Sequence, residues 1–232
     1  MHKKNDSKIS SLPLYSTKRN SGGQALSLQA TYQKEIKMPS AAGCRNPALL
    51  EQILKQYAEG LALENTAVRV VTRGLTLVGI GIRPVLDHFI FRTLRPEEKA
   101  NEFLEMGYER NPASGVLEHK GHGVEIFRKD HAPAILIEHP RKKAGMDWVT
   151  RFGDNKPYAM ALRVDNIDEA AFHMEKQSVG FIRPPAGKHG ETLREIAALP
   201  EMKDGKNAHY LILVERHEGD QRFYPPDFWI HP

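Results

Sequence analysis

An order of predicted elements that occurs twice is the strongest constraint on how this chain folds. Residues 85–94 have the β-branched and aromatic composition of a strand. Residues 95–107 follow with a helical pattern, acidic residues in the first turn and a closing Gly107. The remaining strands of this unit are predicted at 108–111, 115–119, 122–128 and 133–139. The sequence thus predicts a β-α-β-β-β unit.

The same order begins again about 73 residues later. Residues 157–166 have a strand pattern, and residues 167–180 have a helical pattern that closes on Gly180. Strands are then predicted at 181–185, 191–199 and 208–217, although the composition of 191–199 also suits a helix. Two tandem βαβββ units predict an α+β fold. They resemble the vicinal-oxygen-chelate superfamily, whose mixed sheet curls around a central pocket that commonly holds a divalent metal.

The first 44 residues differ in composition from the rest. Residues 1–44 are rich in Ser, Lys, Asn and Gly and are expected to be a disordered basic leader. Residues 1–41 carry seven basic and two acidic residues out of a total net charge of +4, so the remainder is slightly acidic. Nucleic-acid binding is therefore not expected.

One folded domain is predicted over 45–232. It consists of unit one at about 84–140, unit two at about 157–217 and a C-terminal tail at 218–232. An N-terminal helical extension precedes the units. It starts at Asn46-Pro47 and has apolar residues at helical spacing. The apolar stretch 67–78 suits either a helix or a strand.

Several classes of protein are not supported by the sequence. No apolar run approaches the roughly 20 residues that span a bilayer, and the basic start lacks the apolar segment of a secretory signal. Cys44 is the single cysteine, so no intrachain disulfide is possible, and a cytoplasmic location is expected. The expected partner is a small molecule. Neither a membrane nor a nucleic acid is expected, and no oligomeric state is predicted.

Strand alternation selects the candidate site residues. In 85–92, Leu86, His88, Ile90 and Arg92 share one face, while the face with Asp87 and two phenylalanines is expected against the core. The Cα atoms of His88 and Arg92 are expected about 13 Å apart, which suits a metal at one end and a carboxylate at the other. Glu215, on a face with His209, is the candidate for a hard oxygen ligand opposite His88. A 2-His-1-carboxylate set would suit Fe(II).

Short motifs resemble the 2-oxoadipate dioxygenase/decarboxylase family, also called hydroxyglutarate synthase. They are LLEQILKQYAEG (49–60), DHFIFRT (87–93), LEMGYER (104–110), LREIAALPE (193–201) and YLILVERH (210–217). The resemblance implies that His88 and Glu215 bind iron and that Arg92 is the catalytic residue that holds the substrate carboxylate. It also implies an activity that converts a 2-oxo diacid with oxygen to a hydroxy diacid and carbon dioxide.

The second histidine of that family is absent from this chain, because Ala159 stands where it is expected. The third ligand is therefore open. Glu138 and His139 are alternatives, with Glu138 on the face of Leu136, and the late ligand position falls on Leu213 if the alignment shifts by two. Arg92 needs a partner, either an internal carboxylate or a substrate.

Three functional hypotheses follow. The first is a metal-dependent oxygenase/decarboxylase acting on a small 2-oxo acid. The second is a metal-free module of the same fold that binds a small acid. The third is a glyoxalase-like isomerase or lyase, in which Glu138 is a ligand or base.

Overall fold

A computed structural model describes residues 47–77, 85–111, 117–119, 122–154 and 156–224. The expected leader at 1–44 and tail residues 225–232 lie outside these ranges. No helix of the described residues has the length and apolar character needed to span a membrane.

Two helices precede the sheet. Helix α2 (Pro47–Glu64) buries Leu50, Ile53, Leu54 and Tyr57, the apolar face expected from the spacing. Helix α3 (Thr66–Leu77) occupies the stretch that suited either a helix or a strand. The buried Asn65 favours the helix, because its side-chain oxygen accepts a hydrogen bond from the Val68 amide at 3.0 Å. Its amide nitrogen donates to the His209 carbonyl oxygen at 2.8 Å.

The first unit has the predicted order. Its elements are β1 (Leu86–Arg92), α4 (Pro96–Glu105), β2 (Glu109–Arg110), β3 (Leu117–His119), β4 (His122–Arg128) and β5 (Ala134–Pro140). Gly107 follows α4 at φ +81°, a left-handed conformation that glycine adopts readily. Strands β1 and β5 pair in parallel, and the connection between them includes α4 and three strands.

The second unit departs from expectation in its details. Its elements are β6 (Ala159–Arg163), α6 (Ile167–Glu175), β7 (Leu193–Ala197) and β10 (Tyr210–Arg216). The expected strand at 181–185 is reduced to an isolated bridge between Phe181 and Ala198. Helix α5 (Lys143–Phe152) and the hairpin of β8 (Met202–Lys203) and β9 (Lys206–Asn207) were not expected from the sequence.

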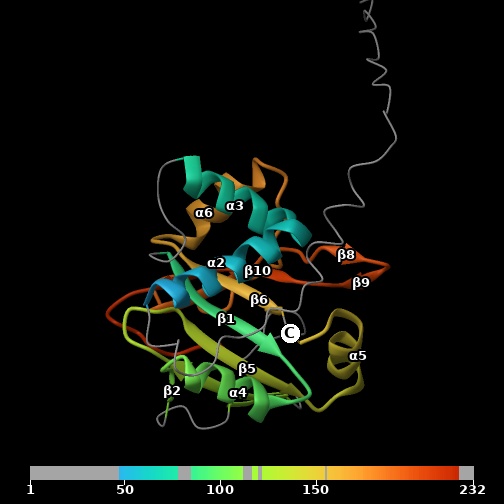
Figure 1. The fold of residues 1–232 in the computed structure, drawn as a ribbon. Coiled ribbons are helices and arrows are strands. Elements are labelled where there is room, and N and C mark those ends of the chain that lie inside the picture. The colour runs from blue at the N-terminus through green and yellow to red at the C-terminus, as the bar shows by residue number, and fades with distance from the viewer. Residues whose placement is uncertain (1–46, 78–84, 112–116, 120–121, 155, 225–232) are drawn as a thin grey trace, which may run out of the picture. The chain divides into compact units, whose positions relative to one another are not determined.

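The two units join in one mixed sheet. Its strand order is β2-β4-β5-β1-β6-β10-β7, with β3 paired to β4. Strands β1 and β6 meet antiparallel in the middle, and each has the last strand of its own unit as a parallel neighbour. This arrangement confirms the α+β architecture of two tandem units (Figure 1).

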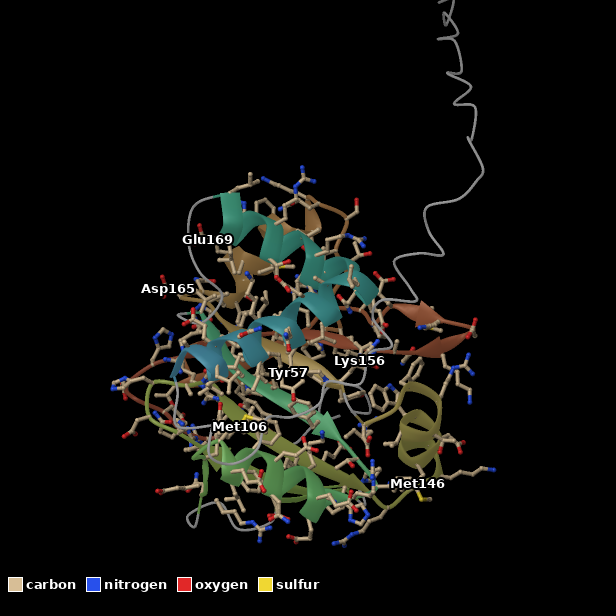
Figure 2. All side chains as sticks on the ribbon, viewed as in Figure 1. Tyr57, Met106, Met146, Lys156, Asp165 and Glu169 are labelled. Atoms are coloured by element: carbon tan, nitrogen blue, oxygen red, sulfur yellow. The ribbon has the colours of Figure 1, made fainter. Side chains whose placement is uncertain are left out.

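The sheet has two buried faces. We call one the helical face, because Phe89, Phe91 and Leu211 pack there with residues of α2, α4 and α6 (Figure 1). Tyr57 of α2, labelled in Figure 2, contacts both phenylalanines, with ring centroids 5.8 and 5.1 Å away. We call the other the cleft face. It is formed by Ile90, Leu136, Ala159, Ala161 and Ile212, with Trp148 of α5 packed against it.

The end of α2 is tied to β10 and β6 by Glu64. His209 Nε2 donates to this carboxylate at 3.1 Å, and Lys156, labelled in Figure 2, also pairs with it. The hydrogen bond from His209, opposed by burial and aided by Lys156, lowers the pKa of Glu64 from 4.5 to about 2. Because the folded pKa is depressed, this stabilisation is complete above about pH 4.5 and is lost as the pH falls toward 2.

We therefore expect Glu64→Gln to lower the free energy of unfolding at pH 7 by roughly 2 kcal/mol, after allowance for partial exposure. The variant's stability should also fall less than that of the native chain between pH 5 and pH 3. Urea unfolding at several pH values measures both effects. Glu169→Gln, at an exposed position of α6, is the matched control. An equal cost for the two substitutions would contradict the prediction.

Candidate functional site

His88 and Arg92 lie on the cleft face, as strand alternation predicts. The intervening Ile90 belongs to that face, while Phe89 and Phe91 pack on the helical face. Both side chains are buried, with 1% and 5% of the residue surface exposed for His88 and Arg92. The sequence therefore placed the first-strand pair on the correct side of the sheet.

Glu215 lies on the opposite side from His88. In β10 its face contains Leu211 and Leu213, which pack on the helical face. Its Oε2 accepts hydrogen bonds from the Ile167 amide at 2.9 Å and from Arg194 Nη1 at 3.2 Å. The expected metal pair of His88 and Glu215 is thus not formed, because the residues of β10 that share the face of His88 are the even-numbered ones. The shift by two also fails to supply a ligand, since Leu213 is on the helical face too.

Arg92 is paired with Glu138. Its Nε and Nη2 donate to Glu138 Oε1 at 3.1 and 3.0 Å, and its guanidinium stacks 3.7 Å from the centroid of the Tyr158 ring. All three residues are buried. Of the two partners that the sequence left open for Arg92, the structure contains the internal carboxylate.

The alternative third ligands do not reach His88 either. Glu138 stands opposite Arg92 in the parallel register, whereas His88 stands opposite Ala134. Glu138 is therefore four residues farther along the strand, about 13 Å away. His139 alternates to the other face of β5. No group of three His, Cys, Asp or Glu residues within the described parts of the chain is arranged to hold a metal. The donor set does not fit the 2-His-1-carboxylate iron site implied by the resemblance.

A break in the β1 ladder changes the setting of Asp87. The register between β1 and β6 shifts between Leu86 and His88, so Asp87 sits beside the imidazole rather than in the phenylalanine core where alternation placed it. His88 Nδ1 donates to Asp87 Oδ2 at 2.8 Å. Arg216 Nε and Nη2 donate to the two carboxylate oxygens at 2.9 and 3.0 Å, and Arg163 Nη2 donates to Oδ1 at 2.9 Å. One feature of the sequence indicated this cluster, namely that Asp87 stands among apolar residues on its strand face.

The charge on Asp87 is held by its neighbours. Burial alone would raise the pKa of this carboxyl, but hydrogen bonds from His88 and Arg216 and the charge of Arg216 hold it well below its usual range. Burial lowers the pKa of His88 more than Asp87 raises it, so the imidazole is neutral at pH 7. Asp87 is thus an ionised carboxylate that orients one neutral imidazole and two guanidiniums.

A cleft of about 1180 Å³ opens beside this cluster. It lies where β1 begins and where β4, β6 and β10 end. Its charged lining residues, His131 apart, are Asp87, Glu109, Arg110, Arg128, Lys129, Asp130, Arg163 and Arg216. Five are basic and three acidic, so the cleft has an excess of positive charge.

Arg128 is a cation in this lining that has no acidic partner among the described residues. It is half-buried and donates two hydrogen bonds to Gln221, at 2.7 Å to the side-chain oxygen and 2.6 Å to the carbonyl oxygen. Within the described part of the chain it forms no ion pair. Burial and the charge of Arg216 lower the pKa of Arg128, so the two guanidiniums repel each other across the cleft wall. An anion between them would relieve that repulsion.

Comparisons with known proteins identify the fold. No model of a known family matches the chain, and no curated protein matches it in sequence. A solved structure from Ralstonia eutropha JMP134, named for the glyoxalase superfamily, is similar with a TM-score of 0.58 and 10% identity, over 78% of this chain and 85% of that one. A structure from Shewanella frigidimarina NCIMB 400, named as a hydrolase, has a TM-score of 0.52 and 12% identity, over 66% and 87%. The chain therefore has the glyoxalase, or vicinal-oxygen-chelate, fold.

Proposed function

We propose that this protein binds a small organic acid in the positively charged cleft without a metal ion. The proposal rests on the half-buried Arg128, which lines the cleft and has no acidic partner in the part of the chain that the structure describes. A guanidinium binds a carboxylate through two parallel hydrogen bonds, and partial burial strengthens that interaction.

Asp87 prepares the site for such a ligand. Its single negative charge orients both Arg163 and Arg216 and neutralises only one of them. The arginines are therefore held in place before the ligand arrives, which reduces the entropy lost on binding. The remaining positive charge favours a ligand with one or two carboxylates.

Titration calorimetry with 2-oxoglutarate tests this function. We expect binding to weaken about tenfold to a hundredfold in Arg128→Gln, because a charge-assisted hydrogen bond contributes roughly 1.5–3 kcal/mol. Affinity should also fall as the salt concentration rises. Arg183→Gln, which removes the same charge from an exposed pair with Glu175 outside the cleft lining, is the control. Equal affinities for the two variants, or no binding by the native chain, would reject the proposal.

Oxygenase/decarboxylase activity on a 2-oxo acid is the second candidate. The position of His88 and Arg92 on one face favours it. The described residues include no cluster of three His, Cys, Asp or Glu that could hold a metal, which disfavours it. Elemental analysis of protein purified without a polyhistidine tag tests this candidate. Stoichiometric iron that is lost in His88→Ala, together with oxygen uptake in the presence of 2-oxo diacids, would support the oxygenase and reject our first proposal.

The isomerase hypothesis is disfavoured by the ion pair between Glu138 and Arg92. A cytoplasmic location stays a prediction from the sequence.

A further inference from the structure

An aromatic side chain of the chain itself forms part of the cleft wall. The ring of Phe223, in the tail that follows β10, lines the cleft. The Cζ atoms of Arg128 and Arg216 lie 4.9 and 4.7 Å from its centroid. The His88 ring meets it edge to face, at 5.1 Å and 84°. Phe223 thus lies within reach of two guanidiniums and one imidazole.

These contacts would hold any aromatic ring of similar size. Cation–π attraction depends on the electron-rich face of the ring and not on the chain to which the ring is attached. Phe223 supplies the ring but no negative charge, so the Arg128 guanidinium beside it keeps its positive charge unneutralised. A ring that carries a carboxylate would make the same stacking contacts and would also neutralise Arg128.

Polar contacts hold the segment that carries Phe223, since Arg216 donates to the Arg222 carbonyl and Arg222 donates to Thr192 Oγ1 at 3.1 Å. Phe223 and Tyr224 also pack against the apolar residues of the cleft face. Phe223 is half-buried, and its neighbours Gln221 and Arg222 are exposed. Gln221 is held by Arg128, and Tyr224 Oη donates to the Leu193 carbonyl at 3.3 Å. Arg128 therefore both holds the tail and faces the cleft. A carboxylate that binds Arg128 would compete with Gln221 and so loosen the segment.

Displacing Phe223 would extend the cleft to His88. The imidazole is not among the cleft-lining residues and is 1% exposed. On the two neighbouring strands it stands opposite Ala134 and Ala161, whose side chains are small. A ligand ring could therefore contact His88 on the cleft face where Phe223 now does.

We infer that the position of the Phe223 ring is a ring-binding subsite, and that the acid bound by this protein is an aromatic carboxylate that displaces Phe223. The inference rests on the proposed function, because it names the chemical class of that ligand. Phe223 competes with the ligand for this subsite. The apparent affinity of the ligand is therefore its intrinsic affinity multiplied by the fraction of molecules in which Phe223 has left the subsite.

Binding of benzoate and cyclohexanecarboxylate to the full chain tests this inference. The two acids have the same charge and nearly the same size, and only benzoate has an aromatic face. We expect Phe223→Ala to tighten benzoate binding about tenfold and to change cyclohexanecarboxylate binding by less than about threefold. Phe223→Leu, which keeps an apolar side chain against the tail site, should give an intermediate gain for benzoate.

Phe172→Ala is the matched control. It removes an exposed phenylalanine that stacks on Lys176 at 4.1 Å outside the cleft lining, and it should change neither affinity. If Phe223→Ala changes the affinities for the two ring acids equally, or changes neither, the ring subsite is overturned. The proposed binding of a small acid still stands in that case, provided that 2-oxoglutarate binding depends on Arg128. Failure of 2-oxoglutarate and of both ring acids to bind any form of the chain would overturn the proposed function as well.

Discussion

Replacing Asp87 with asparagine should lower the free energy of unfolding by about 3–5 kcal/mol, since it leaves buried charge without a counter-charge. Asn has nearly the same shape as Asp, so the loss reports charge and not volume. The Asp87 side chain is 2% exposed, and Arg216, which donates to both of its oxygens, has a side chain that is 5% exposed. The amide of Asn could accept at only one of the two oxygen positions.

Chemical denaturation at pH 7 measures this effect. Asp168→Asn is the control, because Asp168 also pairs with an arginine, Arg194, but its side chain is 48% exposed. That variant should lose less than about 1 kcal/mol. A similar loss of stability in the two variants would contradict the prediction that the buried ion pairs of Asp87 stabilise the fold more than an exposed pair does.

The difference in free energy of unfolding between the native chain and Asp87→Asn should depend on pH. The folded pKa of Asp87 is depressed below 3.8, so its stabilisation is complete above about pH 4 and is lost as the pH falls through the folded value. Denaturation curves should therefore give the same difference in free energy of unfolding at pH 7 and pH 5. The difference should be smaller at pH 3. A difference that instead shrinks between pH 7 and pH 5 would contradict this assignment.

The second large effect is expected at the buried pair of Arg92 and Glu138. Arg92→Met and Glu138→Leu should each lower the free energy of unfolding by about 3–5 kcal/mol, because each leaves one buried charge unpaired. The double variant should be more stable than either single variant, since it replaces the pair with apolar side chains of similar volume. A double-mutant cycle measured by urea denaturation gives the coupling energy.

The same cycle separates the two interpretations of Arg92. If Glu138 is the structural partner of Arg92, the effects of the two substitutions on the free energy of unfolding are not additive. If Arg92 instead serves a substrate, Glu138→Leu should leave stability unchanged and alter ligand affinity. The exposed pair of Arg95 and Glu98, with side chains 59% and 67% exposed, is the control and should show much weaker coupling.

Local patterns were sufficient to predict most of the architecture. The spacing of Leu50, Ile53 and Tyr57 predicted the buried face of α2, and the alternation in 85–92 separated His88 and Arg92 from the phenylalanines. Helix α5 was not predicted, although half of the residues in KAGMDWVTRF are apolar. The burial of Trp148 depends on contacts with Tyr158 and with His209, which is far away in the sequence.

The candidate site was predicted less completely, since it depends on pairs of strands. Alternation placed Glu215 with Leu211 and Leu213 but could not say which face of β10 continues the face of His88. The register with β6 decides this, and it aligns Ile212 with Ala161. Asp87 was assigned to the core because alternation assumes a regular strand, and the shift after Leu86 breaks that regularity.

The sequence by itself determined the two repeated units, the helices that cover one side of the sheet, and the partition of residues within each strand, because these follow from periods of two and 3.6 residues along a continuous stretch. Only the tertiary structure decided that Arg92 pairs with Glu138, that Asp87 gathers two arginines and that Phe223 lies over His88. Each of these contacts joins residues that are far apart in the chain, and the register that brings them together is set by pairing between strands and not by any local pattern.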